Sequence, residues 1–236
     1  MIPLRDDAPK STTPYVNYFL MALNTLVFLF EVALAPQARA LFIFQFGVVP
    51  ENISSLFNGG PHPVPAVAAV LPIVTSMFLH ASWLHLIGNM WALWIFGDNV
   101  EDYLGHFSYL VFYLVSGTLA SLAHLIFNWG SNVPSVGASG AIAGVMGAYF
   151  LLYPAARVLT LIPFFFIYFT WLPAWIVLAY WFVVQFLSGA ATSIAYSDRT
   201  SGGVAFWAHV GGFIAGLALI KLFPRRQPRV LYGDYL

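Results

Sequence analysis

Gly137-Ala138-Ser139-Gly140 opens an apolar stretch that continues Ala-Ile-Ala-Gly-Val-Met-Gly-Ala-Tyr-Phe-Leu-Leu to Tyr153. The stretch has the apolar character of a membrane helix, and it begins with a serine hydroxyl between small residues. Serine in a helix of small residues is usually a packing contact with a neighbouring helix. A nucleophilic role requires a base within hydrogen-bonding distance, so the rest of the chain decides between the two interpretations.

The composition is that of a polytopic membrane protein. Hydrophobic residues make up 60% of the chain and charged residues 8%, against about 45–50% and about 25% in a soluble domain. The formal net charge is zero, so the chain lacks the basic field that nucleic acid binding requires. The absence of cysteine excludes disulfides, thiolate catalysis and cysteine-ligated zinc. We therefore expect the lipid bilayer, and not nucleic acid, as a partner.

Six segments are apolar over roughly the 20 residues that one crossing of a bilayer requires. They lie near residues 15–35, 83–100, 107–127, 138–154, 173–189 and 205–223. The first run is longer than the apolar core of a signal peptide, so we expect it to be retained as a span. The pattern predicts an all-α membrane protein with a cytoplasmic N-terminal segment (1–14), a six-span domain (15–223) and a cytoplasmic C-terminal tail (224–236).

Three apolar runs do not fit this division cleanly. Leu41 to Val49 is too short to cross, and we expect it to lie in the interface or to pack on the bundle. Residues 158–189 are too long for one helix and are interrupted by two prolines, so a loop or surface segment should precede the fifth span. Pro65 to Leu79 is apolar but contains a further proline, and we expect a loop that dips toward the bundle.

Basic residues predict the orientation, because lysine and arginine are enriched on the cytoplasmic side. With six spans both termini share one side. That side carries Arg5, Lys10, Arg157, Lys221, Arg225, Arg226 and Arg229, whereas the other side carries Arg39 and Arg199. The distribution predicts cytoplasmic termini and places Ser139 in the outer part of the membrane.

A histidine, His209, lies inside the sixth expected span, and an ionisable residue in a span indicates function. Ser139 and His209 both lie a few residues from the outer ends of their spans, so we expect them at similar depth. Each span also carries a ridge of small residues for helix packing, Gly140 and Gly144 in the fourth and Gly212 and Gly216 in the sixth. Such ridges let helices approach closely, as a serine–histidine hydrogen bond of about 2.6–3.2 Å requires.

His85 and Asn89 lie four residues apart at the start of the second expected span, so both project from one helix face. This span also begins on the outer side. The two side chains could donate hydrogen bonds to an oxyanion together with the backbone N–H of Ser139. Loss of one such donor typically costs about 2.7–4 kcal/mol of barrier. The alternative is a hydrogen-bonded pair with a structural role.

A serine–histidine dyad is the expected machinery, because no Asp or Glu lies at a matching depth. His209 would accept the proton of Ser139 and return it to the leaving amine, and water would hydrolyse the acyl-enzyme. Water must therefore reach the site. We expect a pocket with His80, Gly137 and Ala138 around it, since irregular backbone at membrane depth is tolerated where it lines a wet cavity.

Metal chemistry and transport are less well supported. A zinc site from His80, His85 and His209 is disfavoured because a five-residue spacing puts the first two on different helix faces. The sequence also lacks a His-Glu-x-x-His motif. A transporter should have an internal repeat with interrupted helices, and the sequence has no repeat. We expect neither a metal nor a cofactor.

Three motifs on the second, fourth and sixth expected spans together resemble the rhomboid family of intramembrane serine proteases. They are Gly-Ala-Ser-Gly at Ser139, Ala-His-Val-Gly-Gly at His209, and the His-x4-His-x3-Asn pattern of His80, His85 and Asn89. The likeness covers most of residues 15–223. It implies a six-helix rhomboid bundle with a long first extracellular or periplasmic loop, a Ser139–His209 dyad, and an oxyanion hole that includes His85 and Asn89. The implied substrate is a transmembrane helix cleaved near its outer end.

The chain departs from the family pattern at two points. Ala143 occupies the position, four residues after the serine, where many rhomboids have an aromatic residue that packs against the histidine. Either another group holds the imidazole, or the imidazole is held more loosely in this chain. A Trp-Arg pair common in the first loop of family members is also missing. The expected form is minimal, which favours a bacterial inner membrane, and the main alternative is a non-catalytic rhomboid-like binding protein.

Overall fold

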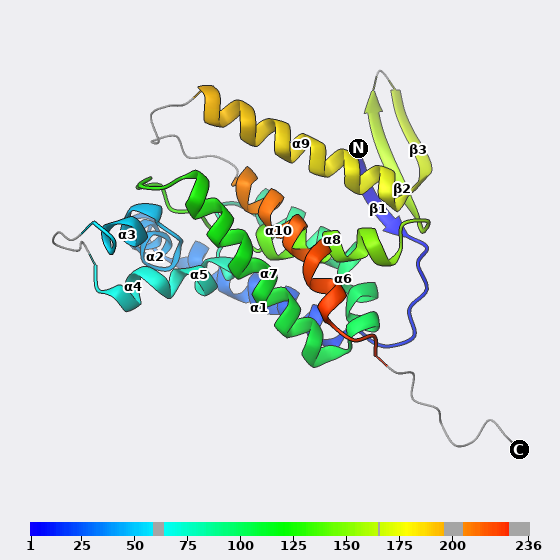
Figure 1. Ribbon diagram of the computed structural model, residues 1–236, viewed down its shortest axis with the longest axis horizontal. Coiled ribbons are helices and arrows are strands. Elements are labelled where there is room, and N and C mark those ends of the chain that lie inside the picture. The colour runs from blue at the N-terminus through cyan, green and yellow to red at the C-terminus, as the bar shows by residue number, and fades with distance from the viewer. Residues whose placement is uncertain (59–63, 165, 196–204, 227–236) are drawn as a thin grey trace, which may run out of the picture.

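The computed structural model describes residues 1–58, 64–164, 166–195 and 205–226 as a helical bundle with a small sheet (Figure 1). The larger helices are α1 (Tyr15–Ala33), α6 (Trp83–Leu104), α7 (His106–Phe127), α8 (Ser139–Leu152), α9 (Ala174–Ala195) and α10 (Phe206–Leu219), which a 3₁₀ turn, η2 (Ile220–Leu222), extends. Each of these helices begins within one residue of the start expected from the sequence.

Three helices among the described residues, α1, α7 and α9, are long and apolar enough to cross a membrane. α6 makes a fourth when it is taken together with the helical segment Ala66–Phe78 before it, from which it is bent by 72°. α8 and α10 are apolar but shorter. The protein is a mostly helical, multi-pass membrane protein.

Polar side chains lie inside the bundle while large apolar side chains cover much of its outside. On α1, the side chains of Asn17, Asn24 and Glu31 are fully buried, whereas those of Phe19 and Leu26 are exposed. Polar residues of membrane helices face the bundle interior because hydrocarbon offers them no hydrogen-bond partner. The outer apolar surface is therefore suited to lipid.

The small residues of α8 and α10 bring the two backbones into contact. A Cβ atom added to Gly212 would lie 3.0 Å from the carbonyl carbon of Gly140, and one added to Gly216 would lie 2.6 Å from that of Gly144. Real Cβ atoms essentially never come closer than 3.0 Å to such neighbours. The two glycine ridges therefore face each other, and α8 is buried continuously from Gly140 to Tyr149.

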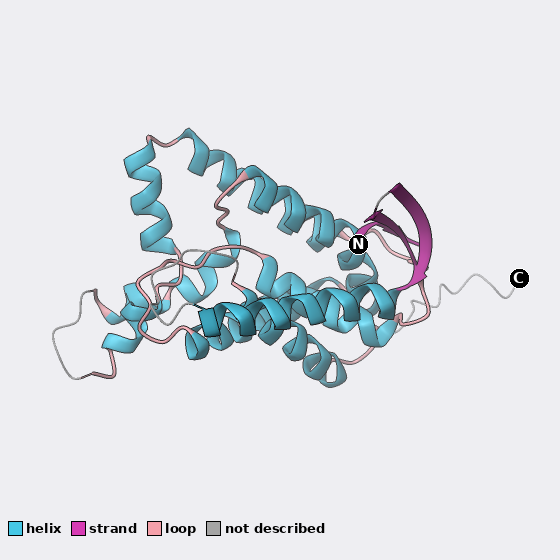
Figure 2. Ribbon diagram, turned by 90° about the horizontal axis from the view of Figure 1, so that it is seen from above, coloured by secondary structure: helices cyan, strands magenta, loops and turns pink. Residues whose placement is uncertain are grey.

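The expectation of an all-α fold is wrong in one respect, because three strands form an antiparallel sheet. The strands are β1 (Ile2–Asp6), β2 (Arg157–Phe164) and β3 (Phe166–Pro173), in the spatial order β1-β2-β3. The run that the sequence analysis assigned to a loop or surface segment is rich in β-branched and aromatic residues, which favour strands. Figure 2 shows this sheet at one end of the helices.

The segment around β1 is attached to α6 and α8. Tyr149 Oη donates to Asp6 Oδ2 at 2.5 Å, and Lys10 Nζ lies 2.6 Å from Asp98 Oδ2. Burial raises the pKa of Asp6 above its usual value. The hydrogen bond to the Asp98 carboxylate raises the pKa of Lys10. These contacts fix the N-terminal segment against the bundle.

Glu101 joins α1, α6 and α7 from a fully buried position. Its carboxylate accepts hydrogen bonds from the N–H groups of Val16 and Asn17 at 3.0 and 2.7 Å. The same carboxylate lies 2.5 Å from Nδ1 of His106. A carboxylate at the start of a helix pairs N–H groups that have no intrahelical partner. Glu101 therefore fixes the start of α1 against the turn between α6 and α7.

Short helices fill the connection between α1 and α6, part of which the sequence predicted as a loop. They are α2 (Pro36–Phe46), α3 (Pro50–Ser55), α4 (Ala66–Val70), α5 (Pro72–Thr75) and the 3₁₀ turn η1 (Ser76–Phe78). Phe42 of α2 contacts Phe30 of α1, with ring centroids 5.5 Å apart, and Thr75 Oγ1 donates to the Phe46 carbonyl at 2.9 Å. Of the two alternatives for Leu41 to Val49, these contacts favour packing on the bundle.

The C-terminal end of the described chain and the segment before α1 both contact the turn between α6 and α7. The N–H of Arg226 donates to the Tyr103 carbonyl at 2.8 Å, and Ser11 Oγ donates to Asp102 Oδ1 at 2.9 Å. The orientation of the chain in a membrane, with both termini cytoplasmic, stays a prediction. Arg199, Arg229 and the greater part of the expected C-terminal tail, residues 227–236, lie outside the described residues.

Candidate functional site

Ser139 is the first residue of α8, and the chain enters this helix through a sharp turn. Gly137 has a φ of +130°, a conformation that favours glycine, and its N–H donates to the Ser76 carbonyl at 2.8 Å. The Ala138 carbonyl accepts the N–H of Ile142 at 3.0 Å. The hydroxyl of Ser139 thus stands at a helix N-terminus, where N–H groups of the first turn lack intrahelical partners.

His209 lies near the start of α10 and meets Ser139 across the α8–α10 contact. Its Nε2 atom is 2.7 Å from Ser139 Oγ, and the residue is 8% exposed. Gly140 follows Ser139 directly, and Gly212 follows His209 by three residues. The backbone contact between these two glycines therefore determines how closely the hydroxyl and the imidazole approach.

Gln185 of α9 contacts the other nitrogen of the imidazole, with 2.7 Å between Gln185 Oε1 and His209 Nδ1. Trp181, one turn earlier on α9, places its ring centroid 5.7 Å from that of the imidazole. Within the described part of the chain, Ser139 and Gln185 are the hydrogen-bond partners of this ring. The sequence analysis missed Gln185, although a carboxamide in the apolar run of α9 is a detectable signal.

His85, Asn89 and His80 form a cluster beside Ser139. The ring of His85 packs against Gly137, where an added Cβ would lie 2.6 Å from His85 Nε2 and 3.5 Å from Ser139 Oγ. Asn89 Nδ2 is 2.9 Å from His80 Nε2, and the ring centroids of His80 and His85 are 5.1 Å apart. The structure thus brings His85 next to Ser139, while the side-chain amide of Asn89 contacts the ring of His80.

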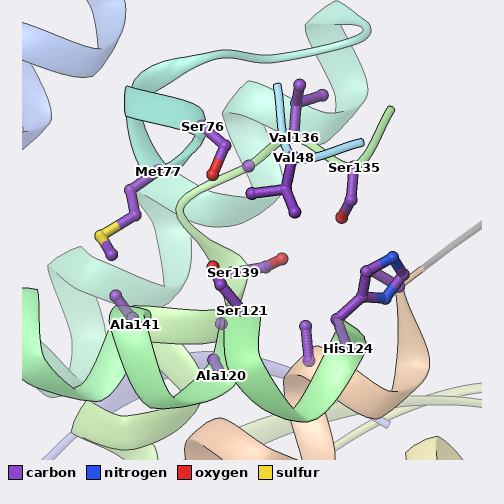
Figure 3. Close-up of a pocket in the computed structure, with 15 residues that line it drawn as sticks. Val48, Ser76, Met77, Ala120, Ser121, His124, Ser135, Val136, Ser139 and Ala141 are labelled. Atoms are coloured by element: carbon purple, nitrogen blue, oxygen red, sulfur yellow. The ribbon is translucent and has the colours of Figure 1, made fainter. Parts of the chain in front are cut away.

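A cavity of about 20 Å³ adjoins Ser139, enough for one water molecule (Figure 3). Its polar lining comes from Ser76, Ser121, His124, Ser135 and Ser139. Figure 3 shows the imidazole of His124 facing this region from α7. His124 is a second residue at the site that the sequence analysis did not identify.

Only one of the three residues expected around the pocket lines this cavity. Gly137 does so, whereas His80 and Ala138 are fully buried and lie outside the lining. His80 is held inside the bundle because Asn89 contacts its ring and its N–H donates to Glu31 Oε1 at 3.1 Å. Ala138 is buried because its backbone forms the entry to α8.

The arrangement contains the groups that acyl transfer requires. A hydroxyl, an imidazole at hydrogen-bonding distance, and donors at a helix N-terminus meet beside a water-sized cavity. Among the described residues, no three His, Cys, Asp or Glu side chains are grouped to hold a metal ion.

The chain was compared with known protein families and curated proteins. Residues 68–226 match the family model of the rhomboid domain. The chain is 31% identical to Rhomboid protein 1, mitochondrial, of Saccharomyces cerevisiae over 174 residues, 72% of this chain and 43% of that protein. It is 35% identical to Rhomboid protease GluP of Bacillus subtilis over 144 residues, 60% of this chain and 25% of that protein.

A third relative is Presenilin-associated rhomboid-like protein A, mitochondrial, of Danio rerio. It is 28% identical over 180 residues, which are 70% of this chain and 42% of that protein. The matched part of the chain thus spans less than half the length of each of these three relatives.

Proposed function

The chain belongs to the rhomboid family, and from this premise we propose that it is an intramembrane serine endopeptidase with a Ser139–His209 dyad. One observation carries the proposal: Ser139 Oγ and His209 Nε2 lie 2.7 Å apart. That distance is within the range of about 2.6–3.2 Å over which a base accepts a proton. A non-catalytic relative would have no need of this pair at a helix N-terminus.

Ser139 attacks the carbonyl carbon of a peptide bond while its hydroxyl proton passes to Nε2 of His209. Collapse of the tetrahedral intermediate breaks the C–N bond, and the imidazolium returns that proton to the leaving amine. Water then attacks the acyl-enzyme, with His209 again as base, and releases Ser139. We assign the cavity of about 20 Å³ beside Ser139 as the binding site of this water.

The oxyanion of the tetrahedral intermediate is stabilised by the N–H of Ser139, His85 and Asn89. The position of Ser139 at the start of α8 supports the first donor, because that N–H is free of the helix ladder. The packing of the His85 ring against Gly137 supports the second. Asn89 has two amide hydrogens, so it can contact His80 and still donate to an oxyanion.

We assign all six larger helices as spans, with both termini cytoplasmic and the connection between α1 and α6 as the long outer loop. α8 and α10 have 14 residues each, or about 21 Å, shorter than a hydrocarbon core of about 30 Å. Because they lie inside the bundle, they need not reach both surfaces. Ser139 then lies below the outer surface. The bacterial inner membrane stays a prediction, since the relatives above include bacterial and mitochondrial proteins.

The proposed substrate is a membrane-spanning helix, cleaved near its outer end. An apolar cavity of about 260 Å³ supports this substrate class. It lies between α6, α8, α9 and the N-terminal residues Met1 and Pro3, and its lining includes Phe96, Met146 and Trp181. Because the Trp181 ring also contacts the imidazole of His209, apolar side chains of a substrate have a place close to the dyad.

Cleavage of a single-span membrane protein by the purified chain in detergent tests the proposal. Ser139→Ala and His209→Ala should each abolish cleavage without lowering the unfolding temperature by more than a few degrees. Ser108→Ala on α7 is the matched control, because Ser108 lies at the opposite end of the bundle from the dyad. Wild-type cleavage by Ser139→Ala would refute the assignment. A wild-type chain that binds the substrate without cutting it would favour the non-catalytic binding protein.

A further inference from the structure

We infer that Gln185 is the positioning residue that orients His209 for catalysis. The inference rests on the proposed function, because it concerns the base of that reaction. It adds a third residue, from a third helix, to the expected dyad.

The two hydrogen bonds of His209 determine where its proton sits. The amide oxygen of Gln185 lies 2.7 Å from Nδ1 and can only accept, so Nδ1 carries the proton. Nε2 then presents its lone pair to Ser139 Oγ, also at 2.7 Å. This is the tautomer that a general base needs. When Nε2 takes the serine proton, Nδ1–H keeps its bond to Gln185, so the ring remains oriented throughout the proton transfer.

Two side chains of α9, Gln185 and Trp181, contact the imidazole of His209. Trp181 lies four residues before Gln185, so both side chains project from the same face of α9. The ring of Trp181 is inclined at 35° to the imidazole. α9 therefore supplies both a packing surface and a hydrogen-bond acceptor for His209.

A neutral amide suits this site better than a carboxylate. A buried carboxylate requires several donors or a cation to offset its desolvation. The buried carboxylate of Glu31 accepts a hydrogen bond from the N–H of His80 and not from the imidazole of His209. An amide that orients a catalytic histidine is known chemistry, as in proteases that use a Cys-His-Asn arrangement.

Two substitutions of Gln185 separate orientation from packing. Gln185→Met keeps the length of the side chain but removes the acceptor, so kcat should fall about tenfold, the value of one net hydrogen bond, with KM unchanged. Gln185→Glu keeps an acceptor oxygen and should retain most of kcat, whereas its stability should fall because the site lacks the further donors that a carboxylate requires. Leu187→Ala is the control on the same helix, because Leu187 is 60% exposed. Wild-type kcat in Gln185→Met, or equal losses in both Gln185 variants, would overturn the inference.

A second measurement is independent of cleavage. Nitrogen-15 NMR of histidine-labelled protein, with the His209 signals assigned from His209→Ala, should report a proton on Nδ1 in the wild type. Gln185→Met should give a mixture of tautomers at His209. If the wild-type chain does not cleave but holds this tautomer through Gln185, the proposed function fails and the positioning role stands. If the chain cleaves and the tautomer is unchanged in Gln185→Met, the positioning role fails alone.

Discussion

Alanine at Gly212 should disrupt the contact on which the Ser139–His209 pair depends. The added methyl carbon would lie 3.0 Å from the carbonyl carbon of Gly140, 3.2 Å from Cβ of Ala120, and closer still to the Gly140 oxygen. Two of these three neighbours are backbone atoms, so no side-chain rotation relieves the contact. The helices must separate until these distances reach the ordinary 3.4–4 Å.

The cost follows from that separation. Overpacking of a close-packed interior typically costs about 1–3 kcal/mol, and we expect Gly212→Ala to lower the free energy of unfolding by that amount. Opening the contact with the Gly140 oxygen to an ordinary distance moves α10 away from α8 by about 1 Å, which also lengthens the 2.7 Å bond between Ser139 and His209. The bond then exceeds the limit of about 3.2 Å for proton transfer, so cleavage should fall at least about tenfold.

Gly88→Ala is the matched control, because a Cβ at Gly88 meets nothing within 4 Å. Alanine loses less conformational entropy than glycine when a helix forms, so this variant should be more stable than the wild type by about 0.5–1 kcal/mol. Both variants can be unfolded in mixed micelles of a mild detergent and SDS, followed by tryptophan fluorescence, and assayed for cleavage. The reasoning is refuted if Gly212→Ala proves as stable and as active as Gly88→Ala.

Three further variants test other contacts. Glu101→Gln removes the charge that accepts two N–H groups of α1 and should cost about 1.5–3 kcal/mol of unfolding free energy, whereas Glu51→Gln, at an exposed position, should have no measurable effect. Because burial raises the pKa of Asp6, the contribution of Asp6 to stability is greatest at low pH and is lost as the pH rises through its folded-state pKa. Asp6→Asn should remove this pH dependence, which unfolding experiments across a pH series can measure. Gly137→Ala strains a φ of +130° and displaces the His85 ring, so both kcat and the free energy of unfolding should fall, with the larger free-energy effect on catalysis. Wild-type values of both quantities would contradict the packing of His85 against Gly137.

Features that depend on local sequence were predictable. Runs of apolar residues marked the starts of the larger helices to within one residue, because span length is set by bilayer thickness. The spacing of Gly140 with Gly144 and of Gly212 with Gly216 marked the faces that meet. The positions of Ser139 and His209 near the starts of their spans predicted a similar depth, and the two side chains do make a hydrogen bond.

Features that depend on a distant partner were not predictable in the same way. β1 has no strong strand signal of its own and forms because β2 pairs with it. Gln185 is recognisable as a polar residue in a span, but its partner depends on how α9 packs against α10. His80 likewise is predicted as a pocket residue, whereas the fold holds it in a buried contact with Asn89.

The pairing of β1 with β2 has a consequence for the order in which the chain folds. Arg157 N–H donates to Asp7 Oδ1 across 150 residues of sequence, while β2 and β3 are paired strands that a single residue separates in the sequence. At a synthesis rate of about 5–20 residues per second, residues 2–6 wait on the order of ten seconds for their partner to be made. The β2–β3 hairpin therefore forms first, with one edge unpaired, and β1 docks last. In ribosome-bound chains, the backbone amides of residues 2–6 should become protected from hydrogen exchange only after the β2–β3 hairpin has emerged.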